Sequence, residues 1–240
     1  EGLLENAVYN INRKNADLKF FELGKIYHKF DNYEERKQLA ILVSGRDKAE
    51  NWLMPKSATD FYMLKAYVKV LLDKLNFNIV EKPLEDIRFD DALEITAGGK
   101  TIARLGKVSH QFLKDFDIDQ DCYYAEIELE TCQALRNTDN FKFVEIPKFN
   151  KIRRDLALLV DKNVSYADLF KAAKKNPSKF LKNINLFDVY EGKNLPEGKK
   201  SYALSFELLN EEKTLEDKDI TEVMNSLIKT FQKEFEAELR

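Results

Sequence analysis

The residues best able to do chemistry in this chain are few and far apart. Its two histidines, His28 and His110, and its two cysteines, Cys122 and Cys132, do not stand at the spacing of a zinc site. Gly98 and Gly99 are adjacent, which indicates a tight hairpin turn, and the other six glycines are scattered, so neither a phosphate-binding loop nor a dinucleotide fingerprint can be written. Acidic residues are plentiful, but nothing in their spacing promotes a catalytic carboxylate pair. We therefore expect no catalytic residue and no metal site.

Composition and length narrow the class of protein. Apolar residues make up 44% of the 240 residues and charged residues 34%, which indicates a globular chain of about two domains. No apolar run approaches the roughly 18 residues of a membrane-spanning helix, so no membrane is expected as a partner. Two cysteines in a chain of this size favour a reduced, cytoplasmic location. The start at Glu1, without a methionine, predicts a piece of a longer protein.

Charge is distributed unevenly, which the net charge of −3 conceals. Residues 1–140 hold 20 basic and 25 acidic side chains, residues 141–202 hold 14 and 7, and residues 203–240 hold 5 and 10. A basic segment of this kind attracts phosphates and predicts salt-dependent binding to nucleic acid. A solvated, lysine-rich surface is the alternative, and charge alone favours it.

The first 140 residues show the periodicities of a mixed α and β domain. Helices are expected over residues 3–12 and 60–76 and after Ser109, and strands over residues 18–30, 38–44, 93–97, 101–105 and 123–130. The helix beginning after Asp60 is expected to bury Leu71 among other apolar residues. The alternation in residues 123–130 places Glu126 on a solvent-exposed face. A polar break over residues 136–140 divides the chain into domains 1–140 and 141–240.

The second domain shows the order strand, helix, strand, strand, helix, strand. Strands are expected over residues 154–160, 180–190, 201–209 and 236–240. Ser165 caps the first helix, with Asp168 at the third helical position, and Pro177 ends it. The last helix begins near Asp217 and shows a full apolar stripe. This order is the split βαβ arrangement of ferredoxin-like domains.

Short sequence motifs in the second domain indicate its family more specifically than composition does. Residues 147–158 read PKFNKIRRDLAL, residues 186–192 read LFDVYEG, residues 195–201 read LPEGKKS, and the chain ends ELR. This ordered set closely resembles the ferredoxin-fold anticodon-binding domain of the bacterial phenylalanyl-tRNA synthetase β-subunit family. The resemblance covers residues 142–240.

The upstream strings resemble another module of the same family. LLENAVYNINR at residues 3–13, FELG at 21–24 and DFYMLK at 60–65 are similar to its class II synthetase-like module, an inactive antiparallel sheet with helices. An active class II strand carries an arginine two places before Glu22, and this chain has Phe20 there. Ala66 and residues 89–91 also depart from the family pattern. The fold class implied is α+β: a class II-like antiparallel sheet followed by a ferredoxin-like βαββαβ domain.

The resemblance also implies a function. This chain would be the C-terminal part of the β subunit, which binds the anticodon stem-loop of phenylalanine tRNA and scaffolds the α subunit. The α subunit would perform aminoacylation with ATP and magnesium in an α2β2 assembly, so no cofactor is expected here. Two alternatives are a ferredoxin-like module that binds a regulatory small molecule and a purely structural interface piece.

The resemblance further assigns RNA contacts. Alternation along residues 187–190 puts Asp188 and Tyr190 on the outer face and Phe187 and Val189 in the core. Tyr190 would stack on an anticodon base, and Asp188 would accept a hydrogen bond from a base edge. The alternative is a half-buried tyrosine beside an aspartate that caps a turn.

Further candidates surround this pair. Ala157 would let a base approach the backbone, although core packing explains it nearly as well, and Arg240 could reach the anticodon unless the terminus is frayed. Ser201 would meet a base or phosphate. The remaining predicted contacts are basic side chains: Lys148, Arg153, Arg154, Lys199 and Lys200. One of the two arginines is expected to pair with Asp155 or to brace the strand, and the other to face phosphate.

Overall fold

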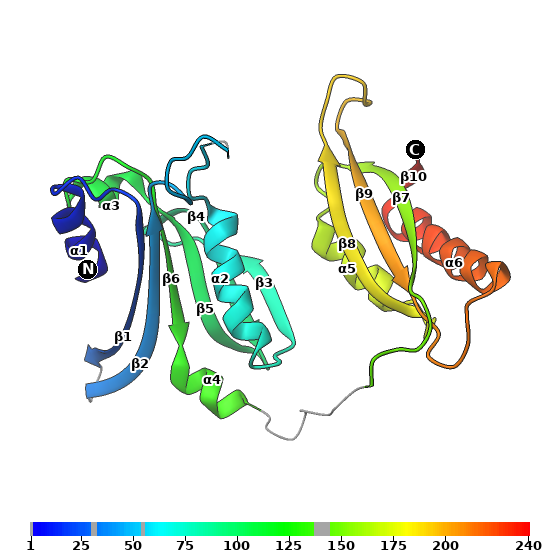
Figure 1. Ribbon diagram of the computed structural model, residues 1–240, viewed down its shortest axis with the longest axis horizontal. Coiled ribbons are helices and arrows are strands. Elements are labelled where there is room, and N and C mark those ends of the chain that lie inside the picture. The colour runs from blue at the N-terminus through cyan, green and yellow to red at the C-terminus, as the bar shows by residue number, and fades with distance from the viewer. Residues whose placement is uncertain (1, 30–32, 54–55, 137–144) are drawn as a thin grey trace. The chain divides into compact units, whose positions relative to one another are not determined.

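The structure of the chain is a computed structural model that describes residues 2–29, 33–53, 56–136 and 145–240. The chain divides into two compact units, Glu1–Lys142 and Phe143–Arg240 (Figure 1). Both units combine helices with an antiparallel sheet, so the predicted α+β class is confirmed. The predicted boundary at residues 140 and 141 lies outside the described residues. Within the described ranges, no helix is long and apolar enough to cross a membrane.

The first unit is built on a six-stranded sheet in the order β1-β2-β6-β5-β4-β3. The strands are β1 (Leu18–Lys29), β2 (Tyr33–Ser44), β3 (Ile79–Pro83), β4 (Phe89–Ala97), β5 (Lys100–Val108) and β6 (Cys122–Glu128). The helices are α1 (Gly2–Ile11), α2 (Phe61–Asp73), α3 (His110–Lys114) and α4 (Leu129–Leu135). Helices α2 and α4 pack with one apolar cluster and helices α1 and α3 with another. Alternate β2 residues enter the two clusters, so the sheet is covered on both faces.

The local signals of this unit formed as expected. The Asp60 side chain accepts a hydrogen bond from the Met63 amide and begins α2. Gly98 and Gly99, both at positive φ, make the tight turn between β4 and β5. Ser109 caps α3 by accepting from the Phe112 amide at 3.2 Å.

Several details of the first unit differ from the sequence expectation, among them strand β3 and helix α4, which no expected strand or helix predicted. Leu71 is 37% exposed on α2 rather than buried. Strand β6 ends at Glu128, because α4 begins at Leu129. Glu126 is 6% exposed rather than on a wet face, because Arg88 and Arg104 approach its carboxylate at 3.2 and 3.5 Å. Such a buried carboxylate needs charged partners, and alternation along the strand alone could not reveal them.

The two cysteines lie in different clusters of the first unit. Cys122 is buried with the α1 and α3 cluster, and Cys132 is buried with the α2 and α4 cluster. Both are free thiols, and burial raises the pKa of each, that of Cys132 to about 11. A disulfide between them would have to pass through the sheet, so the pair plays no part in bridging the chain.

The second unit is a four-stranded antiparallel sheet in the order β10-β7-β9-β8. Its elements are β7 (Ile152–Asp161), α5 (Tyr166–Lys174), β8 (Leu181–Tyr190), β9 (Lys199–Leu208), α6 (Asp217–Phe235) and β10 (Glu238–Leu239). Ser165 and Asp168 form the predicted capping box at the start of α5. The element order is the predicted βαββαβ, which brings the last strand beside the first.

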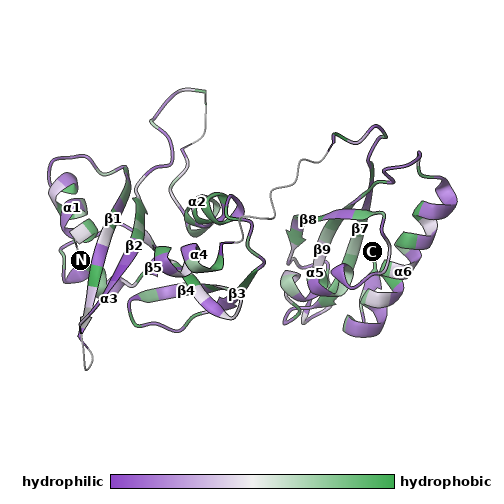
Figure 2. Ribbon diagram, turned by 90° about the horizontal axis from the view of Figure 1, so that it is seen from below, coloured by the Kyte–Doolittle hydropathy of each residue, from purple (hydrophilic) through white to green (hydrophobic). Residues whose placement is uncertain are grey.

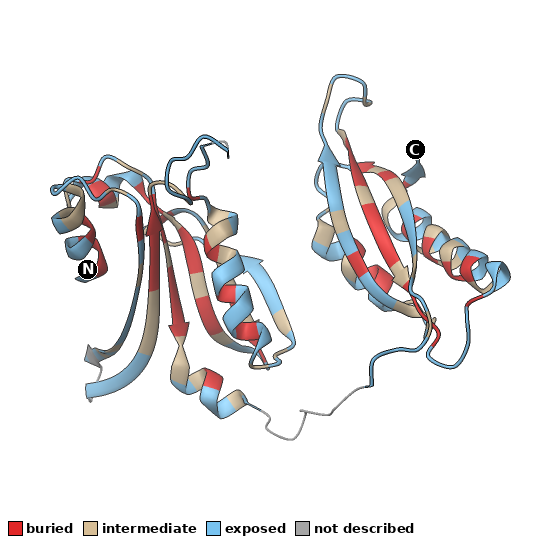
Figure 3. Cartoon of the chain, viewed as in Figure 1, coloured by how far each residue is buried: buried red, intermediate tan, exposed pale blue. Residues whose placement is uncertain are grey.

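Both helices of this unit pack on one face of the sheet. Leu169 of α5 and Leu227 and Phe231 of α6 join the apolar cluster formed by alternate residues of β7, β8 and β9. Strand β9 is buried along most of its length, and α6 buries one stripe while its remainder is hydrophilic (Figures 2 and 3). Among the described residues no helix covers the opposite face, which is called the open face below.

Candidate nucleic-acid interface

The register of the second sheet shows which side chains share the open face. Leu158, Leu204 and Tyr202 belong to the core, so their strand neighbours point the other way. Ala157 of β7 lies opposite Ala203 of β9, which lies opposite Asp188 of β8. The open face therefore carries these residues at one end of the sheet: Ala157, Leu159, Asp188, Tyr190, Ser201 and Ala203.

Small side chains line the centre of this face. The central strand β9 contributes Ser201, Ala203 and Ser205 at alternate positions, and β7 contributes Ala157. Ser201 is only 6% exposed and lies between Leu159 and Tyr190 in the register. The row of small residues leaves a shallow floor over which longer side chains from the outer strands can reach one another.

Arg240 reaches across this floor to Tyr190. Its backbone amide donates to the carbonyl of Ala157 at 3.0 Å, which continues the pairing of β10 with β7. Its guanidinium carbon Cζ lies 5.3 Å from the centre of the Tyr190 ring, a cation–π contact. The last residue is therefore held in place rather than frayed. The predicted residues Ala157, Tyr190 and Arg240 come together although they lie on three different strands or strand ends.

Gly192 holds the other end of the Tyr190 side chain. A Cβ atom at residue 192 would lie 2.1 Å from the Tyr190 hydroxyl oxygen and 2.2 Å from Cζ. Ordinary contacts require about 3.5–4.0 Å, so only glycine permits this position of the ring. Tyr190 itself is 37% exposed, which leaves ring surface open for stacking.

Phe187 does not lie in the core as its position in the alternation suggested. A β-bulge between Leu186 and Asp188 leaves it as an extra residue without a register partner, and it follows Leu186, which faces the core. Phe187 is 49% exposed, and the Cζ atom of Arg153 lies 5.2 Å from its ring centre. Because Arg153 shares the face of Ala157, this contact places Phe187 on the open face. Strand alternation could not predict the bulge.

Val189 also differs from the expectation. It lies opposite Tyr202 in the register and so belongs to the helix-covered face, yet it is 46% exposed because β8 is an edge strand. The prediction that Val189 faces the helices is therefore correct, and the prediction that it is buried is wrong.

The two neighbouring arginines separate as the alternation of β7 requires. Arg153 lies on the open face, where its Nε donates to Asp155 at 2.8 Å, and this hydrogen bond raises the pKa of the guanidinium. Arg154 lies opposite Phe206 and so on the helix-covered side, where its guanidinium donates to the carbonyl of Arg153. The predicted pairing of one arginine with Asp155 is present, and Arg154 does not join the open face.

The predicted lysines do not gather around Tyr190. Lys199 lies 3.3 Å from Asp161, a partner of opposite charge. Lys200 is 8% exposed on the helix-covered face, with its Nζ 4.8 Å above the Tyr202 ring. Lys148 is exposed but precedes β7, at the end of that strand remote from Tyr190. The basic segment is therefore dispersed, and the open face depends on Arg240 and Arg153.

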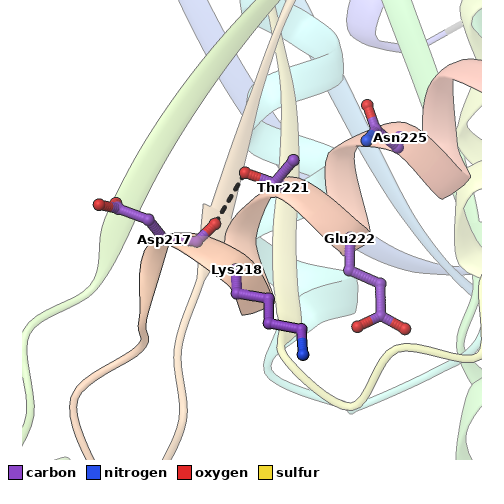
Figure 4. Close-up of a pocket in the computed structure, with 5 residues that line it drawn as sticks. All are labelled: Asp217, Lys218, Thr221, Glu222 and Asn225. Carbon is purple, nitrogen blue, oxygen red and sulfur yellow. Dashed lines mark hydrogen bonds between the residues drawn. The ribbon is translucent and has the colours of Figure 1, made fainter.

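The hollows near α6 are open to solvent and are lined mostly by polar residues. One, of about 480 Å³, is lined by five residues of that helix alone: Asp217, Lys218, Thr221, Glu222 and Asn225 (Figure 4). The Thr221 hydroxyl donates to the carbonyl of Asp217 at 2.7 Å, as the dashed line marks. This hollow does not lie between sheet and helices, where a regulatory small molecule would require an apolar pocket. Within the described ranges, no group of three acidic, histidine or cysteine side chains could hold a metal.

Strand β1 of the first unit carries an apolar side chain, Phe20, where a class II active site would carry an arginine. Phe20 of β1 packs against the α1 and α3 cluster, so the position two residues before Glu22 offers no positive charge. On the opposite face of the same edge strand, Phe21 and Leu23 are 77% and 67% exposed. These residues do not fit a nucleotide, and they do suit contact with another protein.

Comparisons with known proteins agree with this division. The family described as "Ferredoxin-fold anticodon binding domain" matches residues 147–240, which confirms the predicted ferredoxin fold, and that described as "Phenylalanyl tRNA synthetase beta chain CLM domain" matches residues 1–129. The phenylalanine–tRNA ligase beta subunits of Bacteroides thetaiotaomicron and Porphyromonas gingivalis are 44% and 36% identical over 100% of this chain and 31% of their own. The chain thus spans about a third of the length of these relatives. The crystal structure of pyrrolysyl-tRNA synthetase from Desulfitobacterium hafniense aligns with 56% of this chain and 47% of its own at 13% identity, with a TM-score of 0.44 that is too low to assign a fold.

Proposed function

Since the chain belongs to the phenylalanyl-tRNA synthetase beta chain family, we propose that its second unit binds the anticodon region of phenylalanine tRNA. The observation that carries this proposal is the group of Tyr190, Arg240 and Asp188 on the open face. An exposed aromatic ring, a planar cation and a carboxylate acceptor are the groups that recognise unpaired bases.

The geometry supports a role for each group. A base that stacks on Tyr190 gains about 1–3 kcal/mol, and the Arg240 guanidinium adds a second planar surface and donors for phosphate. Asp188 can accept a hydrogen bond from an amino or imino group on the base edge. Ala157 and Ser201 form the floor, where small side chains admit the base, and the Ser201 hydroxyl is available to donate.

We further propose that the first unit scaffolds the α subunit of the ligase. The exposed Phe21 and Leu23 on the edge strand support a protein partner there. In the proposed cytoplasmic α2β2 assembly, the α subunit would use ATP and magnesium to attach phenylalanine. The class II-like character of this unit belongs to the same proposal. The residues around Glu22 do not fit a nucleotide, so no step of the reaction is assigned to this chain.

Binding of two tRNAs tests the anticodon role. The chain is titrated with phenylalanine tRNA and with the same tRNA carrying a swapped anticodon, each at two salt concentrations. We expect weaker binding of the swapped tRNA and a modest salt dependence, since the open face offers few cations and each phosphate contact on a single strand contributes a slope of about 0.7. Equal affinity for both tRNAs would contradict anticodon recognition.

A second experiment separates RNA binding from a purely structural role. The ligase is reassembled with Tyr190→Ala in its β subunit, and aminoacylation is measured at limiting tRNA. We expect a lower kcat/KM for tRNA with an unchanged Michaelis constant for phenylalanine. Unchanged kinetics for both substrates would favour the structural interpretation instead.

A further inference from the structure

We propose that Phe187 and Arg153 form a second stacking site, which receives the unpaired nucleotide adjacent to the one on Tyr190. This inference rests on the proposed anticodon binding and extends it to a second base. Its starting point is the bulge between Leu186 and Asp188, which leaves Phe187 and Asp188 together on the open face.

The exposure of Phe187 has no explanation in the packing of the unit. Phe187 is 49% exposed on a sheet whose apolar cluster is otherwise filled by alternate strand residues. Burying a phenylalanine stabilises a fold by about 1.5–3 kcal/mol, and Phe187 gives up much of that because it follows the core residue Leu186 and so points to the open face. An aromatic side chain displayed there suits a ligand with a flat apolar surface.

Arg153 makes a cation–π contact with Phe187, as Arg240 does with Tyr190. The Cζ-to-centroid distances of the two pairs are 5.2 and 5.3 Å. In each pair an arginine reaches across β9, whose open-face side chains between the two pairs are the small residues Ser201, Ala203 and Ser205. The open face thus holds two equivalent pairs of an aromatic ring and a guanidinium.

The spacing of the two rings suits neighbouring nucleotides. Phe187 and Tyr190 are three residues apart on β8, and the bulge makes their separation along the strand shorter than about 10 Å, the length of three regular residues. Asp188 lies between them and offers its carboxylate to a base edge. Sheets that bind single-stranded RNA use aromatic residues of this arrangement to stack two or three unpaired bases.

Asp155 defines what the second site contributes. It holds the Arg153 guanidinium by two hydrogen bonds of 2.8 and 3.3 Å and neutralises its charge. The pair therefore offers flat surfaces rather than a free cation, and stacking on such surfaces tolerates any base. We expect the site to add affinity without distinguishing one anticodon from another.

The test uses an RNA hairpin with the phenylalanine anticodon loop and four variants of the chain, of which Tyr190→Ala reports on the first stacking site. Phe187→Ala is expected to weaken binding by about 5- to 150-fold, the equivalent of one lost stacked base, with the same factor for a swapped anticodon. Phe187→Trp should bind at least as tightly as the original chain. Val189→Ala is the matched control, since Val189 has a similar exposure on the same strand but faces the helices, and it should leave affinity unchanged.

Each outcome bears on one of the two proposals. Phe187→Ala binding as tightly as the Val189→Ala control would overturn the second stacking site while Tyr190→Ala still weakened binding. In a second hairpin, the nucleotide next to the one on Tyr190 is made abasic, so that no base can stack on Phe187. Phe187→Ala should not weaken binding of this abasic hairpin. If Phe187→Ala weakens binding of the abasic hairpin as much as it weakens binding of the intact one, the second stacking site is overturned. If Tyr190→Ala and anticodon swapping both leave affinity unchanged, the anticodon role itself fails. Equal melting temperatures of the variants show that the sheet is intact.

Discussion

The contact between Gly192 and Tyr190 yields the sharpest prediction. Gly192→Ala adds one methyl group, and the atoms nearest to it all belong to Tyr190. Its effect on RNA binding is therefore expected to arise through that ring. The new Cβ would stand 2.1 Å from the hydroxyl oxygen and 2.2 Å from Cζ of that ring. Against an ordinary separation of about 3.5 Å, the tip of the tyrosine must move by more than about 1 Å. Because Arg240 rests on the ring, the movement also breaks the cation–π contact.

The magnitude follows from what the displaced ring would contribute. Stacking of a base on a well-placed aromatic ring is worth about 1–3 kcal/mol, so the affinity for phenylalanine tRNA should fall by about 5- to 150-fold. Stability should change little. Loss of the exposed Arg240 contact costs about 0.5–1 kcal/mol, and alanine lowers the entropy of the unfolded chain by a comparable amount.

A double-mutant cycle provides the assay. Affinity for phenylalanine tRNA is measured for the original chain, Gly192→Ala, Tyr190→Ala and the double variant, with melting temperatures to check folding. Gly192→Ala should have no effect in the Tyr190→Ala background, because the ring through which it acts is gone. Gly24→Ala is the control, since its Cβ would meet nothing closer than 3.9 Å. If Gly192→Ala binds like the original chain while Tyr190→Ala is weak, the structural argument is refuted.

Three other changes test separate parts of the molecule. Ala157→Leu should fill the floor beneath the Arg240 contact and weaken tRNA binding at least tenfold in a filter-binding assay, with an unchanged melting temperature. Ser165→Ala should lower the free energy of unfolding in urea by about 0.5–2 kcal/mol, since it removes the cap of α5. Burial raises the pKa of Tyr124 to about 12, so its contribution is present below about pH 10 and is lost as pH rises through 12. In the original chain, the free energy of unfolding should therefore fall by up to about 3 kcal/mol more between about pH 10 and 12 than in Tyr124→Phe. Identical dependence of the unfolding free energy on pH in the two proteins would contradict the burial of Tyr124.

Most of the fold could be predicted because its signals are local. The caps at Asp60, Ser109 and Ser165 each depend on a side chain and an amide three residues apart. The turn at Gly98 and Gly99 depends on the freedom of glycine to adopt positive φ. Such interactions depend only on residues close in sequence, so the helices and strands that begin or end at them were expected within a few residues of their observed bounds.

Part of the candidate site could be predicted for the same reason. Alternation along one strand placed Asp188 and Tyr190 on a common outer face, and the structure has them there. The basic side chains could not be assigned in this way. Lys200 faces the helices and Lys199 is paired with Asp161, because their positions depend on strand register and on a partner distant in sequence.

The sequence by itself determined the element order, the ferredoxin fold and the family, since capping, periodicity and ordered strings are properties of the chain read along its length. Only the tertiary structure decided which side chains meet. The contact of Arg240 with Tyr190 joins residues 50 positions apart across two intervening strands, and Glu126 is buried because Arg88 and Arg104 converge on it. The bulge between Leu186 and Asp188 puts Phe187 and Asp188 on one face without any local signal. Contacts of this kind form only when the sheet has closed, because register and bulges are set by the strands that pair.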